Sequence, residues 1–138
     1  MKDQGLIDIL KIISDSNRLR ILNLLFQKEL CVGEIEYLLE LTQSNLSKHL
    51  KIMYDAGMLE KTRQKKFAYY HLKKEFLDAC PFIVQIINEE LSKEACCLKD
   101  KEDLLNYLES EILLDCLPDL ILDKKITNQN NRKIGETK

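Results

Sequence analysis

The 138-residue sequence lacks long apolar runs, a bulk excess of charge of one sign, and more than two histidines. No stretch approaches the roughly 18 consecutive apolar residues of a membrane-spanning helix, so a membrane protein is not expected. The first ten residues include two acidic side chains and no cleavage signal, which argues against secretion. Since 45% of the residues are hydrophobic, a core can form, and we expect one cytoplasmic globular domain.

The sequence also lacks the residue patterns of common catalytic sites. We find no Ser, His and Asp combination for nucleophilic catalysis, no glycine-rich phosphate loop and no paired acids in a plausible cleft. We therefore do not expect an enzyme.

The net charge of −2 hides a strong segregation of charge along the chain. Residues 43–74 carry eight basic and two acidic side chains, a net charge of +6, whereas residues 75–123 carry three basic and thirteen acidic ones, a net charge of −10. A basic block between acidic flanks is typical of a surface that binds a polyanion, although a merely solvated surface has the same composition.

Apolar periodicity predicts a mainly helical fold with one β-hairpin. Helices are expected over residues 5–14, 16–27, 32–39, 42–56, 81–97 and 101–114, with Ser16 and Thr42 as N-caps and Gly57 as a left-handed end to the 42–56 helix, and strands over 58–63 and 67–72. The helix that begins at Pro81 has two apolar faces, which favours contacts with its own domain and with a second subunit. We expect one domain over 1–123, with C-terminal helices over about 75–117, and a disordered tail over 124–138.

The order of a short helix, a tight turn and a second helix is the helix-turn-helix pattern, here over about 32–56. The second helix would lie in the major groove, with Leu46, Leu50 and Met53 facing inward. The hairpin, about 58–72, has a basic tip that suits contacts with the DNA backbone or minor groove. The predicted DNA-binding residues are Gln43, Ser44, Asn45, Ser47, Lys48, His49, Lys51, Arg63, Lys65 and Lys66.

Five segments of the sequence carry a family resemblance. They read NRLRIL (17–22), ELCVGEI (29–35), LTQSNLSKHLK (41–51), AGML (56–59) and YYHL (69–72). In this order they closely resemble the arsenic-repressor (ArsR/SmtB) family of winged helix-turn-helix regulators. The resemblance implies a homodimer, formed by the first helix and the helices after the wing, which represses a promoter on double-stranded operator DNA until an inducer binds.

The inducer does not follow from this resemblance, because the family senses soft metals, metalloids or sulfur oxidants through variable sites. The family's zinc sensors need His and carboxylate ligands on the helix after the wing. This chain has only His49 and His71, both in the DNA-binding block. We therefore expect no zinc site on the C-terminal helices, and we interpret His71 as structural.

The family's arsenic repressors that bind metalloid at the short helix carry the pattern Cys-Val-Cys-Asp-Leu-Cys. Here only Cys31 matches, because Gly33 and Glu36 stand at the other two cysteine positions. A complete three-thiolate site within this segment is therefore excluded. Cys31 still lies near a predicted helix N-terminus, which favours a thiolate, although a buried apolar role fits it equally well.

Cys96 and Cys97 are adjacent, and the apolar periodicity predicts that they lie at the end of the helix that begins at Pro81. Neighbouring thiolates can chelate trivalent arsenic or antimony, and an adjacent pair forms a strained disulfide. Some arsenic repressors of the family use such a pair late in the chain. A third thiol could come from Cys116 or Cys31, and less readily from Cys80, which lies about 25 Å from Cys97 along a continuous helix.

The sequence thus predicts a repressor released by As(III) or Sb(III), with Cys96, Cys97, Cys116 and Cys31 as candidate ligands. One alternative is a thiol redox or persulfide switch, for which Cys80 and Cys116 would be the pair. Another is a constitutive DNA-binding protein whose cysteines are structural.

Overall fold

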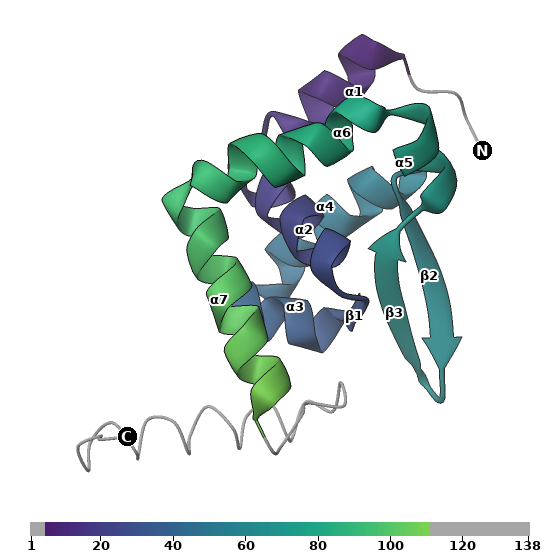
Figure 1. Ribbon diagram of the computed structural model, residues 1–138. Helices are drawn as coiled ribbons and strands as arrows, with labels where there is room; N and C mark the ends of the chain where they lie inside the picture. The colour runs from purple at the N-terminus through teal and green to yellow at the C-terminus, as the bar shows by residue number, and fades with distance from the viewer. Residues whose placement is uncertain (1–4, 111–138) are drawn as a thin grey trace.

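The computed structural model describes residues 5–110, which form a helical body with a small antiparallel sheet at one side (Figure 1). The predicted mainly helical fold with a β-hairpin is confirmed. Cys116, the predicted tail and the end of the predicted C-terminal helices lie outside the described residues. The elements are α1 (Leu6–Ile13), α2 (Ser16–Gln27), β1 (Leu30–Cys31), α3 (Val32–Leu39), α4 (Gln43–Asp55), β2 (Leu59–Gln64), β3 (Phe67–Leu72), α5 (Lys74–Ala79), α6 (Pro81–Gln85), the π-helical turn η1 (Ile86–Glu90), the 3-10 turn η2 (Leu91–Lys93) and α7 (Ala95–Glu109).

Side-chain caps mark the N-termini of α2 and α4. Thr42 caps α4 as predicted, with its Oγ1 accepting a hydrogen bond from the backbone N–H of Asn45 at 3.3 Å. The cap of α2 is Asp15, not the predicted Ser16, because the Asp15 carboxylate reaches the N–H groups of Asn17 and Arg18. A carboxylate at this position also interacts favourably with the positive end of the helix dipole.

The turn between α3 and α4 contains a residue in an unusual conformation. α3 ends at Leu39, and Glu40 follows with φ 56° and ψ 45°, in the left-handed region. After α4, Gly57 has φ 82°, where the sequence predicted a left-handed end to the helix. Glu40 therefore marks the start of the turn after α3, and Gly57 marks the end of the helix-turn-helix.

The hairpin contains the predicted strands and is part of a larger sheet. β2 and β3 pair in antiparallel register from Leu59 opposite Leu72 to Gln64 opposite Phe67. The two-residue strand β1 pairs with β3 on its other side, so the strand order is β1-β3-β2. Sequence analysis missed β1 because two residues are too short to show a period of two. Through β1 the hairpin is joined directly to the start of α3.

The region after the hairpin differs from the predicted continuous helix over 81–97. The helical chain is interrupted by η1 and η2 and ends at Glu94, whose φ of −84° and ψ of 130° are extended. The spacing of Ile83, Ile87 and Leu91 still keeps one apolar side buried along this irregular segment. α7 then starts at Ala95 and runs in another direction across α2 and α3 (Figure 1).

Cys96 and Cys97 therefore lie in the first turn of α7, and the prediction that they end the preceding helix is wrong. Periodicity could not locate this boundary, because the apolar Ala95 and the two cysteines continue the pattern of the preceding segment. The change of direction buries Leu104, which is 1% exposed, against the α2–α3 layer.

The core is centred on α2, where Ile21, Leu22 and Leu24 are completely buried. α1 packs against α2 and buries Ile9 and Ile13, with Ile12 half-buried. Leu6, Ile7 and Leu10 of α1 stay on the surface, with exposed fractions of 57%, 67% and 43%. Among the described residues, no helix combines the length and apolar character needed to cross a membrane.

Candidate nucleic-acid interface and thiol sites

The exposed face of α4 carries most of the predicted DNA-binding residues. Leu46, Leu50 and Met53 are buried as predicted and attach α4 to the core. Six of the seven predicted DNA-binding residues of α4 are exposed, namely Gln43, Ser44, Asn45, Ser47, Lys48 and Lys51. Short hydroxyl and amide side chains near a helix N-terminus can reach base edges, and lysines can reach phosphates.

His49 has a different environment from its neighbours on α4. Its Nε2 lies 4.0 Å from the Asp15 carboxylate, and only 13% of its side chain is exposed. Burial acts to raise the pKa of Asp15, but the Arg18 N–H and the charges of His49 and Arg18 outweigh it, so the pKa is lowered. His49 thus connects α4 to the start of α2, whatever contact it also makes with DNA.

The hairpin tip exposes Arg63, Lys65 and Lys66. Arg63 donates a hydrogen bond from Nη1 to the backbone carbonyl of Lys66 at 3.3 Å, which stabilises the turn. Further down the hairpin, the ammonium of Lys61 lies 4.5 Å from the centre of the Tyr54 ring and 5.7 Å from that of Tyr70. Lys61 therefore joins the hairpin to α4 by cation–π contacts.

His71 lies in β3 between two carboxylates. Its Nδ1 is 3.5 Å from Glu29 and its Nε2 is 3.4 Å from Glu60. This arrangement ties β2 and the segment before β1 to β3, in agreement with the structural interpretation of this histidine.

Two of the candidate cysteines lie in separate parts of the core. Cys31 is 1% exposed at the N-cap of α3, its N–H donates to the Glu34 carboxylate at 3.1 Å, and it is disulfide-bonded. Cys80, which the redox alternative named as a disulfide partner, is instead a free, buried thiol at the end of α5, and burial raises its pKa. Within the described part of the chain, neither Cys31 nor Cys80 lies close enough to complete a ligand cluster with Cys96 and Cys97.

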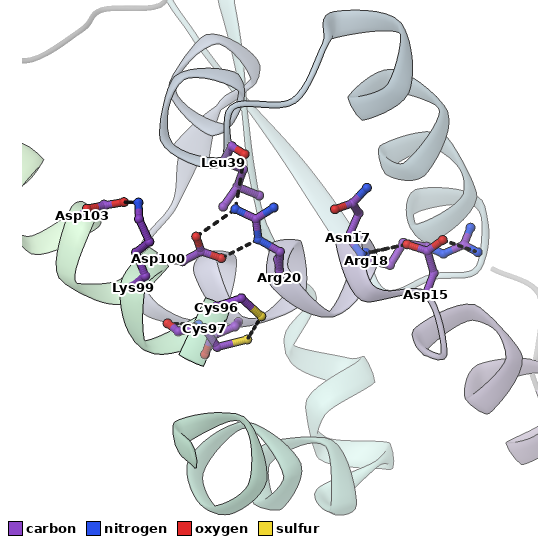
Figure 2. A network of polar contacts seen from close by, with 11 residues as sticks. Asp15, Asn17, Arg18, Arg20, Leu39, Cys96, Cys97, Lys99, Asp100 and Asp103 are labelled. Carbon is purple, nitrogen blue, oxygen red and sulfur yellow. Dashed lines mark hydrogen bonds and ion pairs between the residues drawn. The ribbon is translucent and has the colours of Figure 1, made fainter. Parts of the chain in front are cut away.

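Cys96 and Cys97 bring two sulfurs together at the start of α7 (Figure 2). The Cys96 thiol donates to the Cys97 sulfur across 4.0 Å, and Cys96 is exposed whereas Cys97 is buried. Burial, together with Cys96 and Asp100, raises the pKa of Cys97 to about 12, although Arg20 opposes the shift. Two metal–sulfur bonds of about 2.3 Å at a pyramidal centre hold their sulfurs roughly 3.5 Å apart, so the two thiols need only a small approach to share one arsenic atom.

The polar network beside these thiols connects α7 to α2 and α3 (Figure 2). Arg20 of α2 donates from Nε and Nη2 to the two Asp100 carboxylate oxygens, at 2.8 and 2.9 Å, and from Nη2 to the Leu39 carbonyl at 3.2 Å. Near the other end of α7, the Tyr107 hydroxyl donates to the carboxylate of Glu34 in α3. Asp100 is 1% exposed, Tyr107 5% and Glu34 7%.

Sequence analysis missed these four network residues. Arg20 and Asp100 are 80 positions apart, and Glu34 and Tyr107 are 73 apart, so no local spacing connects them. One signal was present, because helical spacing from Leu104 places Asp100 on the same face as that inward leucine.

Comparison with known proteins gives consistent matches over the helix-turn-helix. A family model described as a bacterial regulatory protein of the arsR family matches residues 15–61. The arsenical resistance operon repressor of Bacillus subtilis (strain 168) is 36% identical over 93 residues, which cover 67% of this chain and 79% of that protein.

Two solved structures have the same fold. The transcriptional repressor BigR from Xylella fastidiosa superposes with a TM-score of 0.58 at 26% identity, covering 64% of this chain and 86% of that one. The homodimeric winged helix-turn-helix domain Mb0332 from Mycobacterium bovis gives 0.52 at 26% identity, covering 65% of this chain and 92% of that one. The sequence match, the fold and the order of elements together establish that the chain belongs to the arsR family of bacterial regulatory proteins, a family of transcriptional regulators and not of enzymes.

Proposed function

We propose that the protein is a homodimeric, cytoplasmic repressor that binds operator DNA and is released when As(III) or Sb(III) binds its cysteine thiols. The observation that carries this proposal is the Cys96–Cys97 pair, whose sulfurs lie 4.0 Å apart on a helix packed against the helix-turn-helix. The similarity to an arsenical resistance operon repressor supports the same class of inducer.

The DNA-binding part of the proposal rests on α4 and the hairpin. The exposed polar residues of α4 are available to base edges, and Lys48 and Lys51 to phosphates. The basic hairpin tip extends this positive surface beyond the helix. A winged helix-turn-helix places these two elements against the same duplex.

The homodimer rests on the apolar surface of α1. Leu6, Ile7 and Leu10 are all more than two fifths exposed, which is costly for a helix at the surface of a monomer. A second copy that packs against α1 would cover these three side chains. The proposed dimer would place two α4 helices on successive major grooves.

The chemistry at the thiols is an exchange of ligands without oxidation. Each thiol replaces one hydroxyl group of arsenous acid: an As–S bond forms, an As–O bond breaks, and the thiol proton leaves with the hydroxyl as water. The raised pKa of Cys97 opposes this step, because the thiolate is the ligand, so the Cys97 proton must leave as the As–S bond forms. The third position would be filled by a retained hydroxyl or by a third thiol, for which Cys116 and Cys31 remain the proposed sources.

Release from DNA needs only a moderate coupling between the thiol site and α4. A coupling free energy of about 1–3 kcal/mol corresponds to a decrease in operator affinity of about 5–150-fold. We propose no zinc site on the C-terminal helices, since that region contains no histidine.

A second candidate function is favoured by one observation, the disulfide bond of Cys31. Oxidation of two thiols to a disulfide releases two protons and two electrons, which a polysulfide can accept by breaking a sulfur–sulfur bond. A disulfide at the N-cap of α3 would act directly on the first helix of the helix-turn-helix. The protein would then be a thiol redox or persulfide switch of the same fold.

Native mass spectrometry of the fully reduced protein, followed by anisotropy with labelled DNA selected by the protein, separates these functions. As(III), Zn(II) and a polysulfide are offered separately to the wild type, to the Cys96→Ser/Cys97→Ser variant and to a matched Cys80→Ser control. We expect the wild type and the control to take up arsenic and release DNA, and the double variant to do neither.

The remaining outcomes assign the function differently. A sulfur-bridged product that releases DNA without arsenic uptake would support the redox switch. Arsenic uptake that leaves DNA affinity unchanged, or equal release by the double variant, would contradict the proposed inducer site.

A further inference from the structure

The guanidinium of Arg20 connects the helix of the thiol pair to the helix-turn-helix. Asp100 lies four residues after Cys96 and three after Cys97, so all three share one face of α7. The same turn is tied to α2 a second time, because Asn23 Nδ2 donates to the Cys97 carbonyl at 3.4 Å. Any rearrangement of the first turn of α7 therefore reaches Asp100 and α2 directly.

The Nη2 atom of Arg20 is shared between two structural elements. It donates to Asp100 of α7 at 2.9 Å and to the carbonyl of Leu39 at 3.2 Å. Leu39 is the last residue of α3, and the left-handed Glu40 follows it at the entrance to the turn before α4. A shift of Asp100 must change the direction of the guanidinium and hence its bond to this turn.

α7 is attached near both ends of α3. At one end Arg20 connects Asp100 to Leu39, and at the other the Tyr107 hydroxyl donates to Glu34. Because the Tyr107–Glu34 contact is buried and α7 is a regular helix between the two contacts, displacement of the part-buried Arg20 contact would tilt α3 about the other. α4 is attached to α3 by a three-residue turn and would tilt with it.

We propose that Arg20 is the positioning residue that transmits a bridge between Cys96 and Cys97 to the helix-turn-helix, through Asp100 on one side and the Leu39 carbonyl on the other. This inference rests on the proposed function, and it assigns the regulation of that site to a residue that touches neither inducer nor DNA. The geometry requires arginine, because the ammonium of a lysine cannot reproduce the two-pronged contact with a carboxylate.

Phenylarsine oxide provides a test that does not depend on the natural inducer. It condenses with two neighbouring thiols, forming two As–S bonds and releasing one water from its oxygen and the two thiol protons. The full-length, reduced protein is loaded with the reagent, and loading is counted by native mass spectrometry and mapped with the Cys96→Ser/Cys97→Ser variant. The readout is the ratio of operator affinities without and with the reagent.

We expect this ratio to be about 5 or more in the wild type and to fall to about 1 in Arg20→Lys and Asp100→Asn, with equal loading of the reagent. Asp103→Asn is the matched control: the same chemical change is made on α7, at a carboxylate that pairs with exposed Lys99 at 2.7 Å. It should keep the wild-type ratio. If the single variants fail to fold, Arg20→Met/Asp100→Leu removes both partners together and replaces the first two variants.

Three results would overturn the inference: loaded variants that keep the wild-type ratio, a loaded wild type with unchanged operator affinity, or a wild type that takes up no reagent at Cys96 and Cys97. A wrong choice of inducer in the proposed function would give a different set of results from these three. In that case arsenite would not release the wild type from DNA, while phenylarsine oxide would still release it in an Arg20-dependent manner.

Discussion

The DNA-facing surface and the α7 side of the molecule use charge in opposite ways. On α4 the Lys51–Asp55 ion pair is four residues apart, and 77% of the lysine side chain is exposed. On the α7 side, Arg20 and Asp100 are 80 residues apart and the carboxylate is 2% exposed. The exposed pair contributes little to the stability of the fold. The Arg20–Asp100 pair stabilises the fold and, through the same contacts, would transmit the proposed signal.

The largest effect should come from removing one partner of the buried pair. Arg20→Met leaves the Asp100 carboxylate buried without its main partner and should lower the free energy of unfolding by about 3 kcal/mol. Urea unfolding followed by circular dichroism measures this change. The Arg20→Met/Asp100→Leu double variant should recover most of the loss, and an equally unstable double variant would show that packing around Arg20, and not charge, is responsible.

A smaller loss is expected at the other end of α7. Tyr107→Phe removes the hydroxyl that donates to Glu34 but keeps the aromatic ring, which lies 6.2 Å from that of Tyr37. The free energy of unfolding should fall by about 1–2 kcal/mol. Tyr54→Phe, the same change at an exposed tyrosine of α4, is the matched control in the same unfolding experiment, and an equal loss there would contradict a specific role for the Tyr107–Glu34 contact.

The cap of α2 should contribute about 1 kcal/mol, which Asp15→Ala would remove at neutral pH. The pKa of Asp15 is lowered in the folded protein, so its contribution is present above the ordinary value of 3.8 and is lost as the pH falls through the lower, folded value. Wild-type and variant stabilities, measured from pH 7 to pH 2, should therefore converge in acid. A constant difference across this range would mean that the carboxylate charge does not matter.

The smallest effect on stability, within about 0.5 kcal/mol, is expected on the DNA-facing side. Lys65→Ala at the hairpin tip should instead weaken DNA binding and reduce the slope of log affinity against log salt by about 0.9. Lys99→Ala, which removes an exposed lysine from α7, should change neither quantity. If Lys65→Ala lowered the free energy of unfolding as much as Tyr107→Phe does, the contrast between the α4 side and the α7 side would be wrong.

The same contrast explains what the sequence could predict. The buried positions of α4, its Thr42 cap and the turn at Gly57 follow from local spacing and turn chemistry, and all three were predicted correctly. The start of α7 was misplaced because Ala95 and the cysteines continue an apolar pattern across the break. The Arg20–Asp100 contact could not be predicted, because it depends on how two distant helices pack. The individual DNA-contacting residues and the inducer ligands remain predictions.

The two-residue strand β1 has a consequence for the speed of DNA binding. By pairing with Tyr69 and Tyr70 it fixes the middle of β3 to the start of α3 before any DNA arrives. The conformational entropy of ordering the hairpin is then lost during folding, and encounter with DNA does not have to supply it again. Association should accordingly approach the rate of a rigid, electrostatically steered pair, with only the tip around Lys65 left to adjust.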